Sequence, residues 1–471
     1  MICTSYYLIQ DPHLEYGSQF IDHLYLRYGY RAVCLFTNRR ERVFHEAALS
    51  RLGSDRVAAA HDCDSNRIIE PLCEIRKRYD IIGVIPFNET SILPASQIAS
   101  FLGLSWAQPA VIPLFRDKFA LKEHLRTSAP DLRVNASCLV RSSTEALVRR
   151  RQPGYRRFVL KPNDGYGNRD VCLFDHESPA AAIRAYFDRV GSTAIVMEEH
   201  IAGTEYFVNG QVDARGDVHT VAVFEYARRF ANGRHDLDFE TRRIDHGTML
   251  FESCARYAEE VLRATGLKRS PFHLELKLDA RGPCLVEVAA RLPGHGNAFL
   301  SGELHGGLDL IEVAAHFYLS SDHRDLPLNW NAYNSRAVRY VHGIAPRSER
   351  LYELAGIAEV EALPEFHRWI RKPEIGTKVQ RTVDCLSMPW SLILKAPTEV
   401  QATAAAERVR RLIRWNWRIG SGSARRAALY LKFMVPKAVK RIRQEILARI
   451  PTGGRRPVER SNLTRHRLGR V

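Results

Sequence analysis

Several familiar patterns are missing from this sequence, and each absence argues against a class of protein. The nine cysteines include no CxxC pair and no cluster with histidine, which argues against structural zinc or a disulfide framework and favours a reducing compartment. No GxGxxG follows the first predicted strand and GxxxxGK(S/T) is absent, so neither a dinucleotide fingerprint nor a Walker A loop is indicated. No uncharged run approaches membrane-spanning length, and the N-terminal residues lack the basic segment of a signal peptide, so we expect a cytoplasmic protein.

The positive charge is concentrated at the C-terminal end of the chain. Of a net charge of +16, residues 421–471 contribute +12, with fourteen Lys or Arg against two Glu. A Gly/Ser-rich segment at 419–423 predicts a flexible hinge before this basic tail. Residues 439–450 then place apolar side chains on one helical face and basic side chains on the other. Such a helix can lie peripherally on an anionic membrane, bind an acidic partner, or dock on the folded body, and the sequence leaves these alternatives open.

The length of 471 residues exceeds one compact core, so two to four domains are expected. Residues 1–112 alternate strands (6–9, 32–36, 57–60, 81–85) with helices (19–28, 40–51, 67–78), which predicts a parallel βαβ sheet. An amphipathic helix at 113–127 and strands at 158–161, 194–197, 206–210 and 218–226 indicate an α+β region. Strands at 337–342 and 391–395 and a helix at 400–415 predict a further α+β part. The expected parts are 1–112, 113–330, 331–419, and a hinge and tail at 420–471.

The most informative segment is a predicted β-hairpin at 272–289. If its turn centres on Arg281, Glu275 and Glu287 lie opposite each other on one face, with Cβ atoms about 4.5–5.5 Å apart. Two carboxylates this close repel unless a cation lies between them or one stays protonated. A magnesium ion that bridges phosphate oxygens would remove the repulsion. Arg291 follows on the same face, so the pattern suggests a nucleotide-phosphate site.

Two further segments fit such a site, although each is weak alone. Lys161 ends a predicted strand and is followed at once by a loop that contains Gly165 and Gly167, whose backbone N–H groups could approach phosphate oxygens. The other is an apolar strand that leads into the acidic pair Glu198 and Glu199. Taken separately, these segments are better explained as a plain turn and a strand followed by solvated acids. Arg242-Arg243 and the polar loop 245–248 are further candidates for binding a carboxylate substrate.

Together and in this order, the segments resemble the ATP-grasp superfamily, and within it the carboxylate–amine ligases such as L-amino acid ligases and carnosine synthase-like enzymes. The resemblance extends from about residue 80 to residue 300 and rests on five short motifs. They are Arg116-Asp117-Lys118, Val159-Leu160-Lys161-Pro162, the segment from Glu198 to Glu205, Glu275, and Glu287 followed four residues later by Arg291. It implies an ATP-grasp fold, in which two α+β subdomains clasp ATP, with a flap subdomain at about 136–200.

The resemblance also implies roles for the residues that hold the triphosphate. Lys118 and Lys161 match the two lysines that bind the nucleotide phosphates, and the loop at Gly165 and Gly167 matches the flexible flap that closes over them. Arg291 matches the arginine that stabilises charge on the transferring phosphoryl group. We therefore expect Arg291 to be the catalytic cation.

For the nucleoside, the resemblance implies binding by residues of the acidic segment. Glu198 and the backbone of Ile201 match adenine contacts, Glu199 lies beside them, and Glu205 matches the ribose-binding acid.

For the metal, Glu275 and Glu287 match the magnesium ligands, with Mn²⁺ as an alternative ion. One position departs from the pattern: many relatives have Asn two residues after the second glutamate, where this chain has Ala289, opposite His273 in the predicted register. The second metal would then have fewer protein ligands and more water.

The implied activity is ATP-dependent ligation of a small-molecule carboxylate to an amine, both of them amino acids or related compounds, through an acyl phosphate. Relatives are often dimers, so a homodimer is an open expectation. Two alternatives remain at this stage: an ATP-grasp carboxylase or nucleotide-pathway synthetase, and a non-catalytic ATP-binding module, which the departure at Ala289 keeps open.

Overall fold

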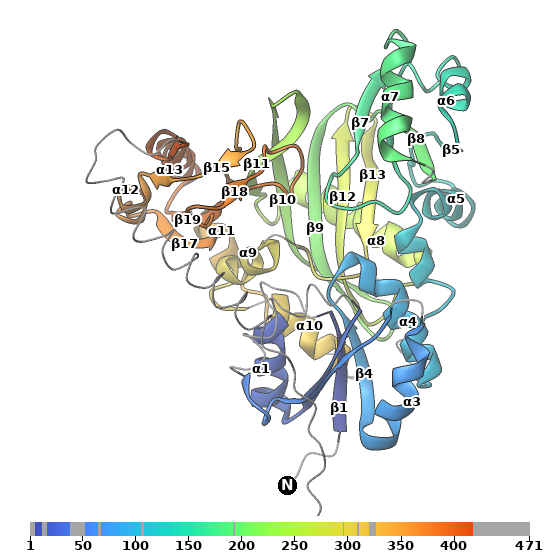
Figure 1. The fold of residues 1–471 in the computed structure, drawn as a ribbon, viewed down its shortest axis with the longest axis vertical. Helices are drawn as coiled ribbons and strands as arrows, with labels where there is room; N and C mark the ends of the chain where they lie inside the picture. The colour runs from blue at the N-terminus through green and yellow to red at the C-terminus, as the bar shows by residue number, and fades with distance from the viewer. Residues whose placement is uncertain are drawn as a thin grey trace, which may run out of the picture.

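The computed structural model describes residues 5–11, 17–37, 52–64, 67–104, 108–191, 194–294, 296–308, 310–319 and 326–417. The predicted helix at 40–51, the hinge, and the basic tail lie outside the described residues. Figure 1 shows the described elements as a lower N-terminal part, a central sheet, an upper subdomain and a lateral C-terminal part.

The N-terminal part is the parallel βαβ sheet that the sequence predicts. Strands β1 (Ser5–Gln10), β2 (Arg31–Phe36), β3 (Val57–Asp62) and β4 (Asp80–Pro86) pair in parallel in the order β3-β2-β1-β4. Helices α1 (Gly17–Tyr28), α3 (Ile69–Arg78) and α4 (Ile92–Phe101) contact these strands. The short 3-10 turn η2 (Glu89–Ser91) follows β4, so its residues lie at the carboxyl edge of the sheet.

The predicted helix at 113–127 begins later than the pattern suggested. Ile112–Arg116 forms a 3-10 helix, η3, and the α-helix α5 covers Lys118–Ser128. Asp117 separates the two because its extended backbone allows its side chain to accept a hydrogen bond from the Ala120 N–H at 2.7 Å. This N-cap places Lys118 at the first turn of α5.

The upper subdomain is a small antiparallel sheet with its own hydrophobic core. Strands β5 (Ser137–Val140), β6 (Arg157–Pro162), β7 (Cys172–Asp175) and β8 (Ile195–Glu199) have the order β5-β8-β6-β7. Helices α6 (Ser143–Arg149) and α7 (Ala180–Val190) contact each other, and α6 also contacts β5. The glycine-containing loop connects β6 and β7.

The central sheet has eight strands in the order β13-β12-β9-β10-β11-β14-β19-β17. Their bounds are β9 Thr204–Val212, β10 Val218–Ala231, β11 Arg234–Arg243, β12 Ser270–Asp279, β13 Gly282–Ala289, β14 Ala337–His342, β17 Phe366–Arg371 and β19 Ser391–Ala396. Residues after 330 therefore extend the same sheet through the β11–β14 pairing. At the junction of β8 and β9, a Cβ on Gly203 would lie 2.2 Å from the Leu278 carbonyl oxygen, so only glycine permits this approach.

Helices cover the central sheet and connect it to its neighbours. They are α8 (Met249–Thr265), α9 (Asn297–Leu304), α10 (Leu310–Leu319), α11 (Trp330–Ser335), α12 (Ile357–Glu361) and α13 (Glu399–Leu412). The α10 helix contacts both α1 and the central strands, which joins the N-terminal part to the sheet (Figure 1). The predicted helix at 400–415 ends early because Ile413 is extended and β20 (Arg414–Asn416) pairs with β16 (Glu353–Ala355). Strands β15 (Glu349–Arg350) and β18 (Lys378–Val379) form another small pair.

The hairpin of β12 and β13 has the predicted pairing of Glu275 with Glu287, but a different turn. Asp279 pairs with Gly282, so the turn centres between Ala280 and Arg281, and Asp279 accepts a hydrogen bond from the Arg281 N–H at 2.8 Å. A β-bulge on β13 at Val286 then shifts the register by one residue and brings Glu287 opposite Glu275. Ala289 lies opposite His273, as predicted.

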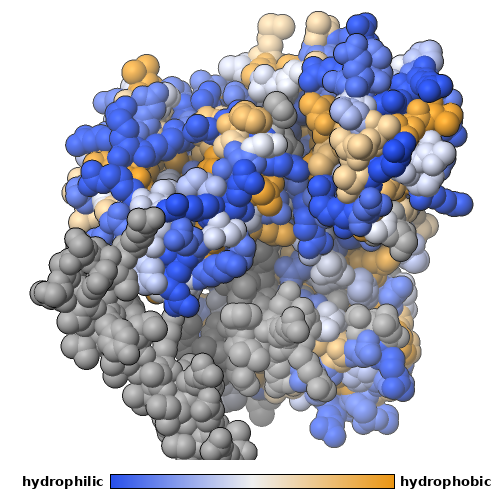
Figure 2. Space-filling model, turned by 45° about the horizontal axis from the view of Figure 1, so that its top comes forward, coloured by the Kyte–Doolittle hydropathy of each residue, from blue (hydrophilic) through white to orange (hydrophobic). Residues whose placement is uncertain are grey.

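The face of the molecule in Figure 2 is mainly hydrophilic where the residues are described. Figure 2 shows apolar side chains scattered among polar ones over the face in view. Within the described residues, no helix combines the length and the apolarity that crossing a bilayer requires. The eight cysteines in these residues are all free.

Candidate functional site

All of the predicted site residues line the same cavity, whose volume is about 1100 Å³. This volume lies just above the range of about 300–1000 Å³ for small-molecule sites, which leaves room for a nucleotide and a further ligand. The walls come from the N-terminal part, the upper subdomain, the central sheet and the segment before β19. The predicted residues in the lining are Lys118, Lys161, Gly165, Gly167, Glu198, Glu199, Ile201, Glu205, Glu275, Glu287 and Arg291.

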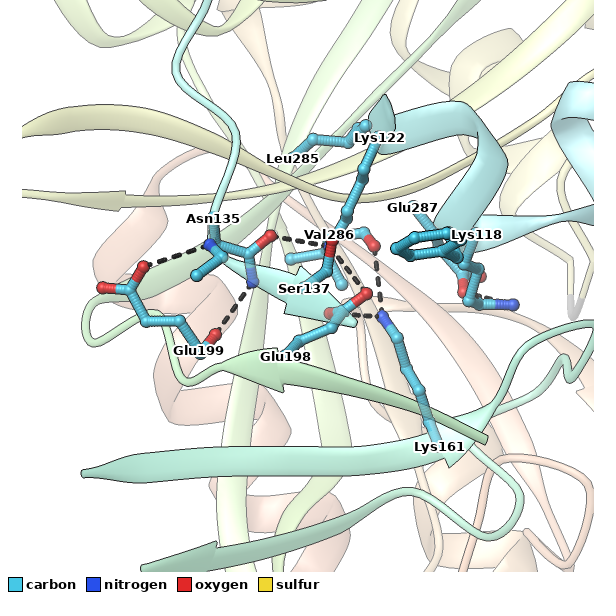
Figure 3. A network of polar contacts seen from close by, with 12 residues as sticks. Lys118, Lys122, Asn135, Ser137, Lys161, Glu198, Glu199, Leu285, Val286 and Glu287 are labelled. Atoms are coloured by element: carbon cyan, nitrogen blue, oxygen red, sulfur yellow. Dashed lines mark hydrogen bonds and ion pairs between the residues drawn. The ribbon is translucent and has the colours of Figure 1, made fainter. Parts of the chain in front are cut away.

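A buried cluster of charges lies beneath one wall of the cavity (Figure 3). The carboxylate of Glu198, on β8, lies 2.7 Å from the Lys122 ammonium of α5 and 2.9 Å from the Lys161 ammonium of β6. Lys161 also donates to the carbonyl oxygen of Val286 at the bulge of β13, at 3.3 Å. The three side chains are almost fully buried. Glu198 therefore holds the end of Lys161 in place between the two sheets.

The electrostatics of this cluster keep its carboxylate charged. Burial opposes the charge of Glu198, but Lys122 and Lys161 outweigh it and lower the pKa of Glu198 to about 2. Burial lowers the pKa of Lys122 to about 8, although Glu198 opposes this change. For Lys161, burial is outweighed by Glu198 and Glu287, so its pKa is raised. All three groups are therefore charged at neutral pH, with one negative and two positive charges.

The glycine-containing loop makes contacts at its start and in its middle. Lys118 donates a hydrogen bond to the carbonyl oxygen of Gly165, and Arg116 donates to that of Asp164 at 2.7 Å. In the middle of the loop, the Cys385 thiol donates to the Gly167 carbonyl oxygen at 2.8 Å. Lys118 also lies 3.4 Å from Glu287, so it connects the loop to the carboxylate pair.

The carboxylate pair lies on one face of the β12–β13 hairpin, next to these lysines. Oε1 of Glu275 accepts a hydrogen bond from the Tyr226 hydroxyl at 3.1 Å and lies 3.2 Å from Nε2 of His273. Oδ1 of Asn209 lies 2.7 Å from Nδ1, the other ring nitrogen of His273. Burial opposes ionisation of Glu275, but contacts with His273, Arg228 and Tyr226 lower its pKa to about 2. Glu275 is therefore ionised and held in place, so its oxygens could bind a metal ion.

The donor set fits a magnesium ion that is shared with phosphate groups. Mg²⁺ prefers oxygen ligands and usually binds proteins through one or two carboxylates, with substrate phosphates and waters completing the shell. Within the described ranges, no group of three or more His, Cys, Asp or Glu side chains could hold a metal by itself. Two opposed carboxylates beside two lysines therefore fit a metal ion bound jointly by protein and phosphate oxygens better than one bound by protein ligands alone.

Arg291 is held by a carboxylate from the N-terminal part. Glu89 of η2 forms an ion pair with Arg291 and another, at 2.8 Å, with Arg116. Burial opposes the charge of Glu89, but the two arginines outweigh it and lower its pKa. The guanidinium of Arg291 therefore has a defined position at the wall of the cavity.

The acids predicted for nucleoside binding have protein partners in this structure. Glu205 forms an ion pair with Arg228 and lies 3.7 Å from Lys277. Glu199 pairs with Arg281 at 3.0 Å. Ile201 is buried in the cavity wall. Glu198 is engaged by two lysines, so its contacts differ from the adenine contact that the resemblance implied.

Of the other sequence candidates, only Arg242 lines the cavity in the described part of the chain. Arg243 is buried instead, where it donates to the Tyr333 carbonyl oxygen at 2.8 Å. In the loop 245–248, Thr248 caps α8 and His246 stacks on Trp330 at 3.9 Å.

Four residues that the motif analysis did not assign contribute to the site: Glu89, Lys122, Tyr226 and His273. Lys122 has a signal in the sequence, because it lies four residues after Lys118 and therefore on the same helical face. His273 lies two residues before Glu275 on the same face of its strand. Glu89 and Tyr226 have no such signal, because their partners are distant in the sequence.

The fold is that of a protein in which two α+β units enclose a cavity with paired carboxylates and two lysines in its lining. Residues 156–298 match the model of the ATP-grasp domain. The chain therefore contains an ATP-grasp domain, and the resemblance seen in the sequence is confirmed.

The chain is similar to several particular proteins. The chain is 24% identical to "Dapdiamide A synthase" of Enterobacter agglomerans over 252 residues, which cover 50% of this chain and 56% of that protein. It matches the structure of an L-amino acid ligase from Bacillus licheniformis with a TM-score of 0.71 at 16% identity, over 88% of this chain and 99% of the other. An N5-carboxyaminoimidazole ribonucleotide synthetase from Thermotoga maritima matches with a TM-score of 0.60 at 16% identity, over 88% and 100%. The chain thus spans about half the length of the first of these relatives.

Proposed function

We propose that this protein is an ATP-dependent, ADP-forming carboxylate–amine ligase. The observation that carries the proposal is the pairing of Glu275 with Glu287 on one face of a cavity that also holds two lysines and Arg291. The ATP-grasp domain and the ligases among the relatives support the same class.

We assign the triphosphate to the side of the cavity where Lys118 and Lys161 lie. Glu198 and the Val286 carbonyl fix the ammonium of Lys161, so it can meet a phosphate oxygen without a large search of rotamers. Glu275 and Glu287 would hold Mg²⁺, or Mn²⁺ in its place. The bound ion would neutralise charge on the phosphate oxygens.

The chemistry follows from these positions. The oxygen of a substrate carboxylate attacks the γ-phosphorus of ATP, the bond to the β-phosphate oxygen breaks, and acyl phosphate and ADP form. Arg291 stabilises the charge on the transferring group from its place beside Glu89. An amine then attacks the acyl carbon, phosphate leaves, and an amide results. The loop at Gly165 and Gly167 covers the site and limits hydrolysis of the acyl phosphate.

The substrates in this proposal are small carboxylates and amines, with amino acids as the first compounds to test. The homodimer stays a prediction. So does the binding of the tail to an anionic membrane or an acidic partner, because the tail lies outside the described residues.

The test is release of ADP and phosphate with pairs of amino acids, in the wild-type chain and in Glu287→Gln. Glu287→Gln keeps the shape of the side chain but removes one metal-binding charge, so turnover should fall by about 10²–10³-fold. Glu225→Gln is the matched control, because Glu225 lines the same cavity but pairs with Arg242 at 3.7 Å. Circular dichroism should show that both variants are folded.

Three results would contradict the proposal. Full turnover in Glu287→Gln would remove the metal assignment. Dependence of ADP release on bicarbonate would indicate a carboxylase. Nucleotide binding without turnover for any substrate pair would indicate a binding module.

A further inference from the structure

A second cavity lies apart from the proposed nucleotide site. Its volume is about 710 Å³, and none of the residues given for its lining also lines the first cavity. The walls come from α1, the end of α9 and the loop after it, α11, β17 and β19 (Figure 1). The charged and polar residues in the lining are Gln19, Glu303, Ser335, Arg336, Arg368 and Lys395. The proposed ligase mechanism uses none of them.

Positive charge is in excess in this second cavity. Among its described lining residues, one carboxylate, that of Glu303, stands against three cationic side chains. The cations are Arg336, Arg368 and Lys395, so two positive charges are left over. A cleft lined by charges of one sign concentrates the field and attracts ions of the opposite sign. The second cavity therefore favours an anionic ligand.

Glu303 is already engaged by other cations of this cavity. It forms an ion pair with Lys395, lies 3.7 Å from Arg368, and has Nε2 of His367 at 2.6 Å from Oε1. Burial opposes the ionisation of Glu303, but contacts with Lys395 and His367 outweigh it and lower its pKa. The carboxylate is therefore ionised and holds Lys395 at the wall, and it does not compensate Arg336.

Arg336 is the cation without a carboxylate partner. Within the described part of the chain, no acidic side chain lies at ion-pair distance from its guanidinium. Its backbone is fixed on both sides, because Asn329 caps α11 before it and Ala337 is buried at the start of β14 after it. The five N–H donors of Arg336 are therefore available at a defined place in the wall.

The space in the second cavity exceeds what a simple ion needs. The loop after α9 has no side chains at Gly306 and Gly307, and Leu304 and Ala332 add apolar surface to the wall. The volume of about 710 Å³ lies within the range of about 300–1000 Å³ for small-molecule sites. An anionic group with an organic remainder fits this combination of cations and apolar surface.

We propose that the second cavity binds a small phosphate-bearing molecule, with its phosphate group between Arg336, Arg368 and Lys395. A phosphate monoester carries about −1.5 to −2 charge at neutral pH, which matches the excess of two positive charges. Arginine forks donate pairs of hydrogen bonds to phosphate oxygens, and lysine adds a point charge. This site goes beyond the proposed ligase function and does not depend on it.

The test is calorimetric titration of inorganic phosphate into the full chain, saturated with Mg²⁺ and ADP, at about pH 8, where phosphate is a dianion. Wild-type protein should bind phosphate, and Arg336→Gln should weaken this binding about 10-fold, because one charge-assisted contact at an exposed position is lost. Arg336→Lys keeps the charge and should recover part of the affinity. Succinate, a dicarboxylate with the same charge, should bind more weakly because its two charges lie on separate groups.

The controls separate this cavity from general electrostatics and from the nucleotide site. Arg256→Gln removes the same charge from an exposed position on α8 outside both cavities, so it should bind phosphate like the wild type. Arg291→Gln alters the first cavity and should keep the phosphate binding that Arg336→Gln weakens. Circular dichroism checks folding; if Arg336→Gln is not folded, Arg368→Gln replaces it, with a similar loss expected.

The inference is wrong if wild-type protein binds no phosphate, or if the folded variant of Arg336 or Arg368 binds it as tightly as the wild type. Loss of all phosphate binding in Arg291→Gln would place the anion in the first cavity and would also overturn the inference. Succinate binding as tight as that of phosphate would contradict the assignment to a phosphate group. Each of these results is independent of ADP release, so failure of ligation is read separately.

Discussion

The buried cluster of Glu198, Lys122 and Lys161 allows a quantitative prediction about stability. Glu198→Gln keeps the size of the side chain but leaves the buried ammonium of Lys122 without a counter-charge and that of Lys161 with only the more distant Glu287. Removal of one partner from a buried ion pair costs about 3–5 kcal/mol. No reduction for solvent screening applies, because Lys122 is 1% exposed, Glu198 4% and Lys161 5%. If the ATP-grasp domain unfolds as a unit, the expected decrease in Tm is about 6–20 °C.

Lys122→Met provides the matched comparison. Glu198 keeps its contact with Lys161 at 2.9 Å in that variant, so no charge is left uncompensated and the loss should be smaller. The double variant lacks the Lys122 ammonium, which Glu198→Gln leaves without a counter-charge. It should therefore be more stable than Glu198→Gln alone, with a coupling free energy of about 1–3 kcal/mol.

The measurement is Tm by differential scanning fluorimetry at one fixed scan rate. The wild type, Glu198→Gln, Lys122→Met and the double variant are compared side by side as a double-mutant cycle. Glu198→Gln should also bind nucleotide more weakly than the wild type, because Lys161 loses the group that positions it. The reasoning is refuted if Glu198→Gln has the same Tm as the wild type, or if the double variant is less stable than Glu198→Gln.

Two further predictions concern pH and the flap. The folded pKa of Glu198 is about 2 and its ordinary value is 4.5, so its stabilisation is complete above about pH 4.5 and is lost as pH falls towards 2. The difference in Tm between wild type and Glu198→Gln should therefore narrow over that window, and a constant difference down to pH 2.5 would contradict the assignment. Gly167 has φ +70°, and a Cβ there would lie 3.2 Å from Cγ of Leu386. An alanine at this φ should strain the loop by about 1–2 kcal/mol. Gly167→Ala should therefore speed dissociation of Mg²⁺-bound ADP about 5–30-fold, as measured by stopped-flow. Gly191→Ala is the control, because Gly191 has a similar φ of +79° but a Cβ there would meet no atom within 4 Å. An equal increase in ADP dissociation in Gly191→Ala would show that the contact between Gly167 and Leu386 is not the cause.

Local patterns in the sequence predicted the parts of the fold that depend on local periodicity. The parallel strands of the N-terminal sheet follow from short apolar runs that alternate with helical segments. The pairing of Glu275 with Glu287 was predicted correctly although the predicted turn was wrong, because the one-residue difference at the turn is compensated by the bulge at Val286. The bulge has no clear local signature, so this compensation could not be anticipated.

Helix ends and long-range charge partners were harder to predict. Asp117 starts α5 later than the apolar pattern indicates, and the β16–β20 pairing ends α13 before Trp415. The partners of the predicted site residues were also missed. Glu89 is 202 residues from Arg291, and Tyr226 is 49 residues from Glu275. Such contacts depend on how the sheets pack, which short motifs do not contain.

The contact of Glu89 with Arg291 has a consequence for how this protein can be divided. The residue assigned to phosphoryl transfer receives its counter-charge from the amino-terminal sheet, although the family signature begins only at residue 156. An excised fragment bearing that signature would keep Lys161, the lysine proposed to bind the nucleotide, but lose the acid that orients Arg291. The smallest catalytic unit is therefore larger than the recognisable domain, and chimeras should exchange both parts together.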